Sequence, residues 1–350
     1  MTSATLTLDL TGLERSLARS LHGRPEVVRL ASAVFLARGH LLLEDVPGVG
    51  KTTLAKALAR AVGGTVGRIQ FTPDLLPSDL TGITIYRQQL NEFEFRPGPL
   101  FATVVIGDEI NRASPKTQSA LLEAMQERQV TVDGTTHALP EPFMVIATQN
   151  PVEMAGTYPL PEAQRDRFMA QTSIGYPDAE HELRVLTGRP DAEHAADAPH
   201  GGNGSNTGNG GNGGNGGNGS NGSNAGNGGN GGNGTAASAL DPGAAAAAID
   251  QVSGVYVAEA VHRYVLALVR ATRDHADVAL GASPRAGLHL VALARAWAAL
   301  AGRDFVLPDD IQDILVPVLG HRLALTREAR SAGRTPAQVL AELRAQLPVP

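Results

Sequence analysis

Short apolar runs alternate with helix-like patterns through the first half of the chain. Each run is bounded by polar residues or glycine, so we predict β-strands at His40–Leu43, Ile69–Phe71, Val104–Ile106, Phe143–Ala147 and Thr172–Ile174. Helical spacing predicts helices at Leu54–Val62 and Ser119–Glu127, the second capped by Ser114 with Pro115 at its first position. Strands that alternate with helices indicate a parallel sheet covered by helices on both faces.

The last part of the chain has helical patterns throughout. Helices are predicted at Val257–Arg273, Pro284–Ala301, Pro308–Leu319 and Pro336–Gln346. We therefore expect a small helical domain after the mixed domain. The predicted boundaries are an N-terminal segment at 1–22, an αβα domain at 23–176, the start of the helical domain at 177–198 and its remainder at 236–350.

The segment 199–235 is almost entirely Gly and Asn with scattered Ser. It has no apolar face to bury, and Gly loses more freedom on folding than any other residue, so we expect a disordered insertion. The entropy of closing a loop grows only slowly with its length, so such an insertion is tolerated inside a domain. A role in recruiting partners is disfavoured because the segment lacks aromatic and charged residues.

Composition narrows the class of protein. The 350 residues are 42% hydrophobic and 18% charged, with a formal net charge of -6, so there is no broad basic surface for nucleic acid. The absence of cysteine excludes disulfides, thiolate zinc sites and cysteine nucleophiles. The N-terminus has no signal-peptide pattern, and no apolar run is long enough to span a membrane. We expect a cytoplasmic protein.

A phosphate-binding pattern follows the first predicted strand, in "EDVPGVGKTTLAKALA". Glycine N–H groups and a helix N-terminus bind phosphates, Lys51 reaches the terminal phosphates and Thr52 ligates Mg²⁺. Asp45 takes the place of the pattern's first glycine; because Asp tolerates left-handed backbone angles, we expect an intact loop with the carboxylate turned away from the phosphates. The predicted nucleotide-binding residues are Pro47, Gly48, Val49, Gly50, Lys51, Thr52 and Thr53.

Two adjacent carboxylates, Asp108 and Glu109, end the third predicted strand in "VVIGDEINRA". Buried together they would be costly unless paired or bound to a metal. Beside a phosphate site, Asp108 is expected to hold Mg²⁺ and Glu109 to polarise the attacking water. The alternative is a strand that exits to solvent, and the neighbouring phosphate-binding pattern disfavours it.

Further polar residues stand at the ends of predicted elements. Asn150 follows the fourth strand and could orient a water, or with Pro151 it simply begins a turn. Arg165 and Arg167 precede the fifth strand. Arg285 lies in the first turn of a helix, where the helix dipole disfavours a cation, which favours a ligand there. Taken alone, each arginine is better explained as a surface charge.

In this order the motifs resemble the MoxR family of AAA+ ATPases. The resembling segments are "HLLLEDVPGVGKTTLAKALA", "RIQFTPDLLPSDLTG", "GDEINRASPKTQSALLEAMQERQVTVDG", "VIATQNPVEMAGTYPLPEAQRDRFMA" and "ALGASPRAGLHLVALARAWAALAGRDFVLPDDIQ". They correspond to the first strand and P-loop, the second strand, the Walker B strand with its helix and hairpin, the sensor 1 and arginine-finger region, and the lid with sensor 2. The likeness covers the chain except its N-terminal end and the Gly/Asn insertion.

The resemblance implies an AAA+ P-loop NTPase αβα sandwich with a five-stranded parallel sheet and a small all-helical lid. It implies a homo-oligomeric ring, usually a hexamer, with ATP and Mg²⁺ between protomers. By analogy Asn150 is sensor 1, Arg285 is the sensor 2 residue of the same subunit, and Arg167 is the finger that enters the neighbour's site, with Arg165 as its rival. Residues near Leu21–Gly23 would contact the adenine.

Family members remodel or mature other protein complexes, often with a partner that carries a von Willebrand factor A domain, so the resemblance implies a chaperone-like ATPase. A DNA motor of the same architecture needs cationic hairpin tips, whereas "QVTVDGTTHALP" turns at Asp133-Gly134 and offers no Lys or Arg. That alternative is disfavoured, and no nucleic-acid partner is expected. A metal-chelatase motor subunit is structurally close and stays open.

Overall fold

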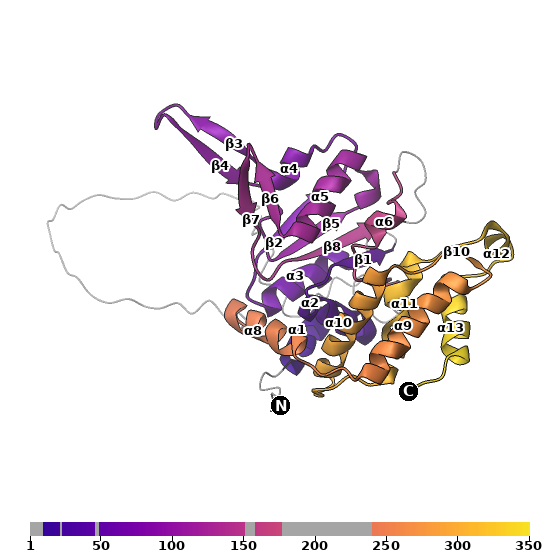
Figure 1. Cartoon of the computed structure of the whole chain (residues 1–350). Helices are drawn as coiled ribbons and strands as arrows, with labels where there is room; N and C mark the ends of the chain where they lie inside the picture. Colours follow the sequence, from indigo (N-terminus) through magenta and orange to yellow (C-terminus); the bar gives the residue numbers. More distant parts are fainter. Residues whose placement is uncertain (1–9, 22, 46–48, 151–157, 177–239) are drawn as a thin grey trace, which may run out of the picture. The chain divides into compact units, whose positions relative to one another are not determined.

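The structure is a computed structural model that describes residues 10–21, 23–45, 49–150, 158–176 and 240–350 (Figure 1). The expected disordered insertion at 199–235 and the start of the helical domain at 177–198 lie outside these residues.

The centre of the described chain is a parallel sheet with the strand order β2-β5-β8-β1-β9. Every pair of neighbours is parallel, and each strand overlaps a predicted one, which confirms the five-stranded parallel sheet. The strands are β1 at Leu41–Glu44, β2 at Val66–Gln70, β5 at Val104–Asp108, β8 at Met144–Gln149 and β9 at Ala170–Thr172. β9 ends two residues before its predicted end, because the backbone N–H groups of Ile174 and Gly175 bond the Asp45 carboxylate instead of a strand.

Different helices cover the two faces of the sheet. Side chains alternate along β1, so that Leu41 and Leu43 join one buried cluster and Leu42 another. The first cluster includes α1 to α3 and the second includes α4 and α5, and each fully buried leucine stabilises the fold by roughly 1.5–3 kcal/mol. The αβα sandwich is confirmed. The helices are α1 at Thr11–Ser20, α2 at Pro25–Leu36, α3 at Lys51–Ala61, α4 at Pro77–Thr81, α5 at Pro115–Glu127 and α6 at Glu162–Arg165, with a 3₁₀ turn η1 at Ile110–Arg112.

The C-terminal part of the described chain is mainly helical, as predicted. Its helices are α8 at Pro242–Ser253, α9 at Glu259–Asp274, α10 at Pro284–Leu300, α11 at Pro308–Leu319, α12 at Arg327–Ser331 and α13 at Pro336–Gln346, with a 3₁₀ turn η3 at Gly320–Arg322. It is not all-helical, because β10 at Val278–Leu280 pairs antiparallel with β11 at Ala324–Leu325. None of the helices in the described ranges is long and apolar enough to cross a bilayer.

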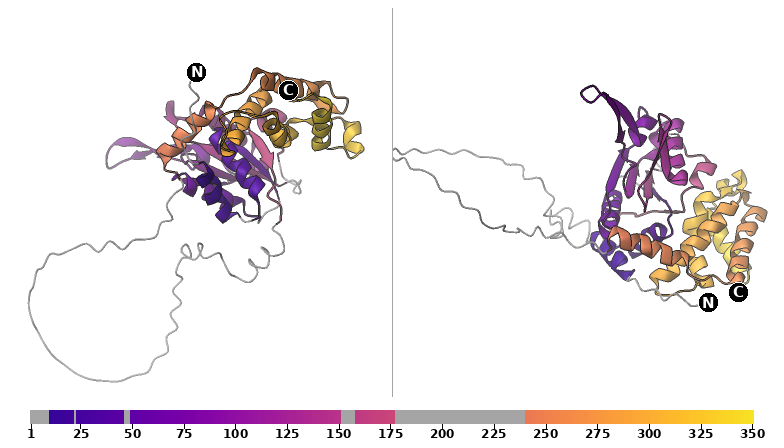
Figure 2. Two further views of the ribbon diagram at one scale, coloured as in Figure 1. Left: turned by 90° about the horizontal axis from the view of Figure 1, so that it is seen from below. Right: turned by 60° about the vertical axis from the view of Figure 1, so that its left-hand side comes forward.

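Two hairpins stand outside the main sheet. The predicted turn at Asp133-Gly134 is confirmed: it joins β6 at Gln129–Val132 to β7 at Thr135–Ala138, and both turn residues have left-handed φ angles of 49° and 79°. The other hairpin pairs β3 at Gly82–Arg87 with β4 at Glu92–Pro97 and was not predicted. It extends away from the sheet in the views of Figure 2, and Phe95 at its base stacks on His137 of β7 with ring centroids 3.9 Å apart.

Candidate functional site

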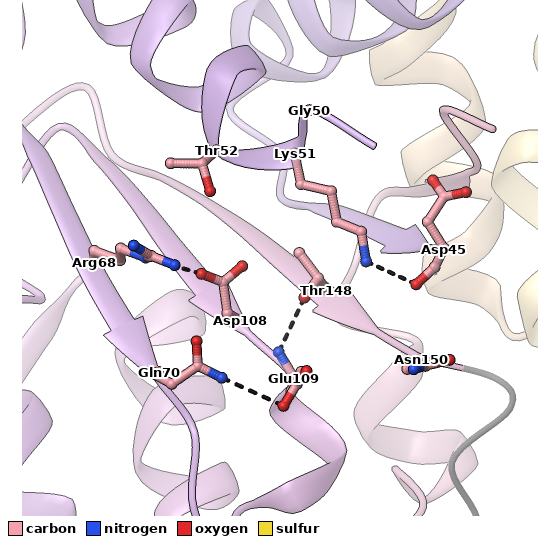
Figure 3. A pocket seen from close by; sticks show the side chains of 10 residues that line it. All are labelled: Asp45, Gly50, Lys51, Thr52, Arg68, Gln70, Asp108, Glu109, Thr148 and Asn150. Carbon is pink, nitrogen blue, oxygen red and sulfur yellow. Dashed lines mark hydrogen bonds and ion pairs between the residues drawn. The ribbon is translucent and has the colours of Figure 1, made fainter. Parts of the chain in front are cut away.

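The carboxyl ends of neighbouring strands meet at one edge of the sheet, where parallel α/β sheets bind ligands. Strands β5, β8 and β1 are adjacent, and with β2 their ends surround a cavity of about 230 Å³ (Figure 3). Its lining residues are all polar except one glycine: Asp45, Gly50, Lys51, Thr52, Arg68, Gln70, Asp108, Glu109, Thr148 and Asn150.

The end of the predicted phosphate-binding loop borders this cavity. Gly50 is the N-cap of α3 with φ of 94°, a conformation that a side chain would strain. Lys51 and Thr52 therefore lie in the first turn of a helix whose free N–H groups favour anions. Burial lowers the pKa of Lys51, and the charges of Asp45, Asp108 and Glu109 oppose that shift. Val49 is buried and Thr53 lies on α3, whereas Pro47 and Gly48 are outside the described residues.

The carboxylate of Asp45 turns away from Lys51 and toward the segment that follows β9. It is only 6% exposed and accepts hydrogen bonds from the Ser173 hydroxyl at 2.7 Å, the Gly175 N–H at 3.1 Å and the Ile174 N–H. Its backbone carbonyl, in contrast, accepts a bond of 2.7 Å from the Lys51 ammonium. Asp45 thus connects the loop that precedes α3 to the segment that follows β9.

Asp108 and Thr52 place a carboxylate and a hydroxyl on opposite sides of the cavity. Figure 3 shows the Thr52 hydroxyl and the Asp108 carboxylate pointing toward one another. One Asp108 oxygen accepts a 3.0 Å bond from Arg68 Nε. A hydroxyl and a carboxylate suit Mg²⁺, which keeps most of its shell for water and phosphate oxygens. Accordingly, the described residues contain no cluster of three or more His, Cys, Asp or Glu side chains that would hold a metal by itself.

Glu109 has an unusual backbone conformation that directs its side chain. Its φ of 59° is left-handed, which is uncommon outside glycine and typical of strained functional positions. The Glu109 N–H donates to the Thr148 hydroxyl at 2.9 Å. One carboxylate oxygen accepts bonds from Gln70 at 3.3 Å and from Arg112 at 2.9 Å. Asn150, at the end of β8, is buried beside the same cavity.

Sequence reasoning missed Arg68, Gln70 and Thr148 as lining residues. A signal existed for each. Arg68 and Gln70 alternate with buried residues along β2, the edge strand of the sheet, and both stand near the carboxyl end of that strand. Thr148 lies in β8 two positions before Asn150, so in extended backbone the two side chains point to the same side.

The predicted arginines lie elsewhere. Arg167 and Arg285 both line a second cavity of about 180 Å³, with His40, Met169 and His289. His40 directly precedes β1 and Met169 directly precedes β9, so this second cavity is at the amino edge of the sheet, opposite Lys51. Arg285 thus lies away from the cavity that Lys51 lines. A role in the nucleotide site of its own subunit would require Arg285 to lie beside that cavity.

Arg165 does not line either of these two cavities. The Nε atoms of Arg165 and Arg167 are both buried without a hydrogen-bond partner among the described residues. Leu21, which was predicted to lie near the adenine, is buried in the core beside Gly50. A Cβ atom added to Gly50 would lie 3.6 Å from a methyl group of Leu21.

A phosphate-binding loop, an acidic pair and a polar strand end on one parallel sheet, followed by a helical lid, define a P-loop ATPase of the AAA+ class. Residues 40–170 match the family model of ATPases associated with various cellular activities, and residues 270–343 match the AAA lid domain.

Relatives extend over nearly the whole chain. The chaperone MoxR1 of Mycobacterium tuberculosis is 39% identical over 93% of this chain and 78% of its own length. The uncharacterized protein YeaC of Bacillus subtilis is 42% identical over 95% of this chain and 92% of its own. The crystal structure of an inferred ATPase from Cytophaga hutchinsonii superposes with a TM-score of 0.80 at 33% identity, covering 97% of this chain and 94% of that one. The chain belongs to the MoxR family of AAA+ ATPases.

Proposed function

We propose that this protein binds ATP with Mg²⁺ in the cavity at the carboxyl edge of the sheet and hydrolyses it. The observation that supports this most strongly is the convergence of Lys51, Thr52, Asp108, Glu109 and Asn150 on one cavity. Lys51 and the N-terminus of α3 would bind the phosphates, and Thr52 and Asp108 would hold the metal ion. Bound Mg²⁺ would neutralise charge on the phosphate oxygens.

Glu109 is the proposed general base, and Asn150 would help to orient the attacking water. The Glu109 carboxylate lies at the cavity wall with one oxygen already bonded by Gln70 and Arg112. Such bonds fix the direction of the carboxylate relative to the cavity.

We further propose a homo-oligomeric ring, a hexamer by family resemblance, in which the second cavity faces the nucleotide of the neighbouring subunit. Arg167 and Arg285 line that cavity together, which supports a role for both in the neighbour's site rather than a same-subunit role for Arg285. Arg167 is favoured over Arg165 as the finger, because only Arg167 lines it. A cation supplied in this way stabilises the charge of the transition state and can raise the rate of hydrolysis by roughly 10³–10⁵-fold.

The energy of hydrolysis would drive chaperone-like remodelling of partner proteins, including one with a von Willebrand factor A domain. The name of the MoxR1 relative supports the chaperone role. The β6–β7 hairpin carries no Lys or Arg, which supports a protein partner over DNA. A cytoplasmic location is part of the proposal, because the reaction requires cellular ATP.

The direct test is equilibrium binding of ATP, with Mg²⁺ and with EDTA. Lys51→Ala should weaken binding by roughly tenfold to a hundredfold, since a charged hydrogen bond contributes about 1.5–3 kcal/mol. Lys56→Ala, which removes an exposed lysine from the same helix, is the matched control and should bind like the wild type. Equal affinities for both variants would rule out the proposed cavity.

A further inference from the structure

Asp166, between the two finger candidates Arg165 and Arg167, is held by residues of the helical domain. Arg322 Nε of η3 donates to one carboxylate oxygen of Asp166 at 2.7 Å. The Ser283 hydroxyl donates to the other at 2.9 Å. Both oxygens of the Asp166 carboxylate therefore accept hydrogen bonds from residues more than a hundred positions away in the sequence. Asp166 is the neighbour in sequence of each finger candidate.

Arg322 is the centre of this contact. Its side chain is only 2% exposed. The same guanidinium donates to the carbonyl oxygens of Phe168 at 2.6 Å and Met169 at 3.2 Å, and it bonds His289 Nδ1 at 2.6 Å. The guanidinium is planar and holds five N–H donors in a fixed fork. It therefore donates hydrogen bonds to oxygens of Asp166, Phe168 and Met169 at the same time.

The half-buried His289 and the buried His321 complete the surroundings of Arg322. Burial, and after it the charge of Arg322, lower the pKa of His289 to about 3, so its ring is neutral near pH 7 and Nδ1 can accept the bond from Arg322. Burial and Arg322 also lower the pKa of His321 well below its usual value. The His321 Nε2 atom lies 3.1 Å from the Phe168 carbonyl oxygen and can donate to it.

The Ser283 contact extends this connection to Arg285. Ser283 is the N-cap of α10, with its hydroxyl accepting from the Ala286 N–H at 3.3 Å, and Arg285 lies in the first turn of that helix. One carboxylate is thereby adjacent in sequence to Arg167 and hydrogen-bonded to the cap of the helix that carries Arg285. Both arginines line the second cavity.

We propose that Arg322 is a positioning residue, which locks the segment Asp166–Met169 to the helical domain so that Arg167 and Arg285 reach the neighbour's nucleotide together. Arg322 does not line the second cavity, so its effect on hydrolysis would pass through the other two arginines. This inference rests on the proposed ATPase function and on the role of both arginines in the neighbour's site.

The test separates positioning from folding by mixing subunits. Arg322→Lys keeps the charge but loses the fork, and it should lower turnover by roughly tenfold or more while ATP binding stays within about twofold. Glu109→Gln subunits lack the base but keep all three arginines. Mixed rings contain interfaces where an Arg322→Lys subunit holds the nucleotide and a Glu109→Gln subunit supplies intact arginines. Turnover of the mixture should exceed the sum of the separate variants severalfold.

A matched control comes from a second ion pair of the helical domain. Arg303 donates to Asp310 at 2.8 Å, and the Asp310 side chain is only 5% exposed. Arg303→Lys should lower the thermal midpoint while turnover at low temperature stays like the wild type. Asp166→Asn changes one atom and should repeat the Arg322→Lys pattern, so it decides the matter if Arg322→Lys fails to fold.

Wild-type turnover in Arg322→Lys or Asp166→Asn would overturn the proposal. So would folded Arg322→Lys subunits that give no recovery when mixed with Glu109→Gln subunits. These results differ from failure of the proposed function, in which the wild-type protein itself would not hydrolyse ATP.

Discussion

The Lys51 ammonium lies 2.7 Å from the carbonyl oxygen of Asp45, the residue that takes the place of the first glycine of the phosphate-binding loop. The carboxylate of the same Asp45 is buried against the three residues that follow β9. A residue that departs from the P-loop pattern thus connects Lys51, the proposed phosphate-binding lysine, to the segment that follows another strand of the sheet. This contact explains why an acid is compatible with a loop that is proposed to bind phosphate.

Asp45→Asn should lower the free energy of unfolding. An amide oxygen accepts fewer bonds than a carboxylate, so at least one buried donor after β9 loses a charged partner, at a cost of about 1.5–3 kcal/mol. Chemical denaturation of the full chain measures this, and Asp274→Asn, on an exposed acid at the end of α9, is the control. Stability equal to the wild type would show that the Asp45 contacts do not form.

Gln70→Ala should raise turnover by about threefold, the equivalent of a hydrogen bond of roughly 0.7 kcal/mol. The Gln70 amide donates to the Glu109 carboxylate at 3.3 Å and so occupies one of the two oxygens that could accept the proton of the attacking water. Steady-state phosphate release measures the effect. Gln89→Ala, in the exposed turn of the β3–β4 hairpin, should leave turnover unchanged. Reduced turnover in Gln70→Ala would mean that this bond serves to orient Glu109 instead.

His40 should make stability depend on pH. Burial, and to a smaller extent the charge of Arg128, lower its pKa from 6.5 to about 4, although the hydrogen bond to the Met125 carbonyl oxygen at 3.1 Å acts in the opposite direction. Nδ1 accepts from the Val145 N–H at 2.9 Å, which requires that this nitrogen carries no proton. The unfolded chain binds this proton more readily than the folded one. Stability is therefore fully present above pH 6.5 and falls by an amount on the order of 3 kcal/mol as the pH drops toward 4.

Unfolding measured across that pH range checks this, with His40→Gln expected to flatten the dependence. His262→Gln, at an exposed histidine of α9, should preserve it. Equal slopes in the wild type and His40→Gln would contradict the assignment of a buried neutral ring.

The sheet and the phosphate site were predictable because their signals are local. Short apolar runs mark β1 and β5, and the glycines and Lys51 are contiguous in sequence. Helix α2 was missed because its residues are buried nearly all round, which removes the amphipathic period. The β3–β4 hairpin was missed because both strands carry exposed residues on each face and have no buried side to create a pattern.

The placement of the arginines could not be predicted, because it depends on packing between distant segments. Sequence order puts Arg285 near the start of a helix but does not say which edge of the sheet that helix approaches. The approach is fixed by Arg322 and Ser283, which bond Asp166 from the far end of the chain. Only the folded structure brings these residues together.

The most direct test of the account compares ATP binding and turnover in the Glu109→Gln variant. The amide keeps the size of the side chain but cannot accept the proton of the attacking water, so turnover should fall by about 10²–10⁴. ATP affinity should stay near that of the wild type, since Lys51, Thr52 and Asp108 are unchanged. Wild-type turnover in this variant would contradict the claim that the cavity between Lys51 and Glu109 is where ATP is hydrolysed.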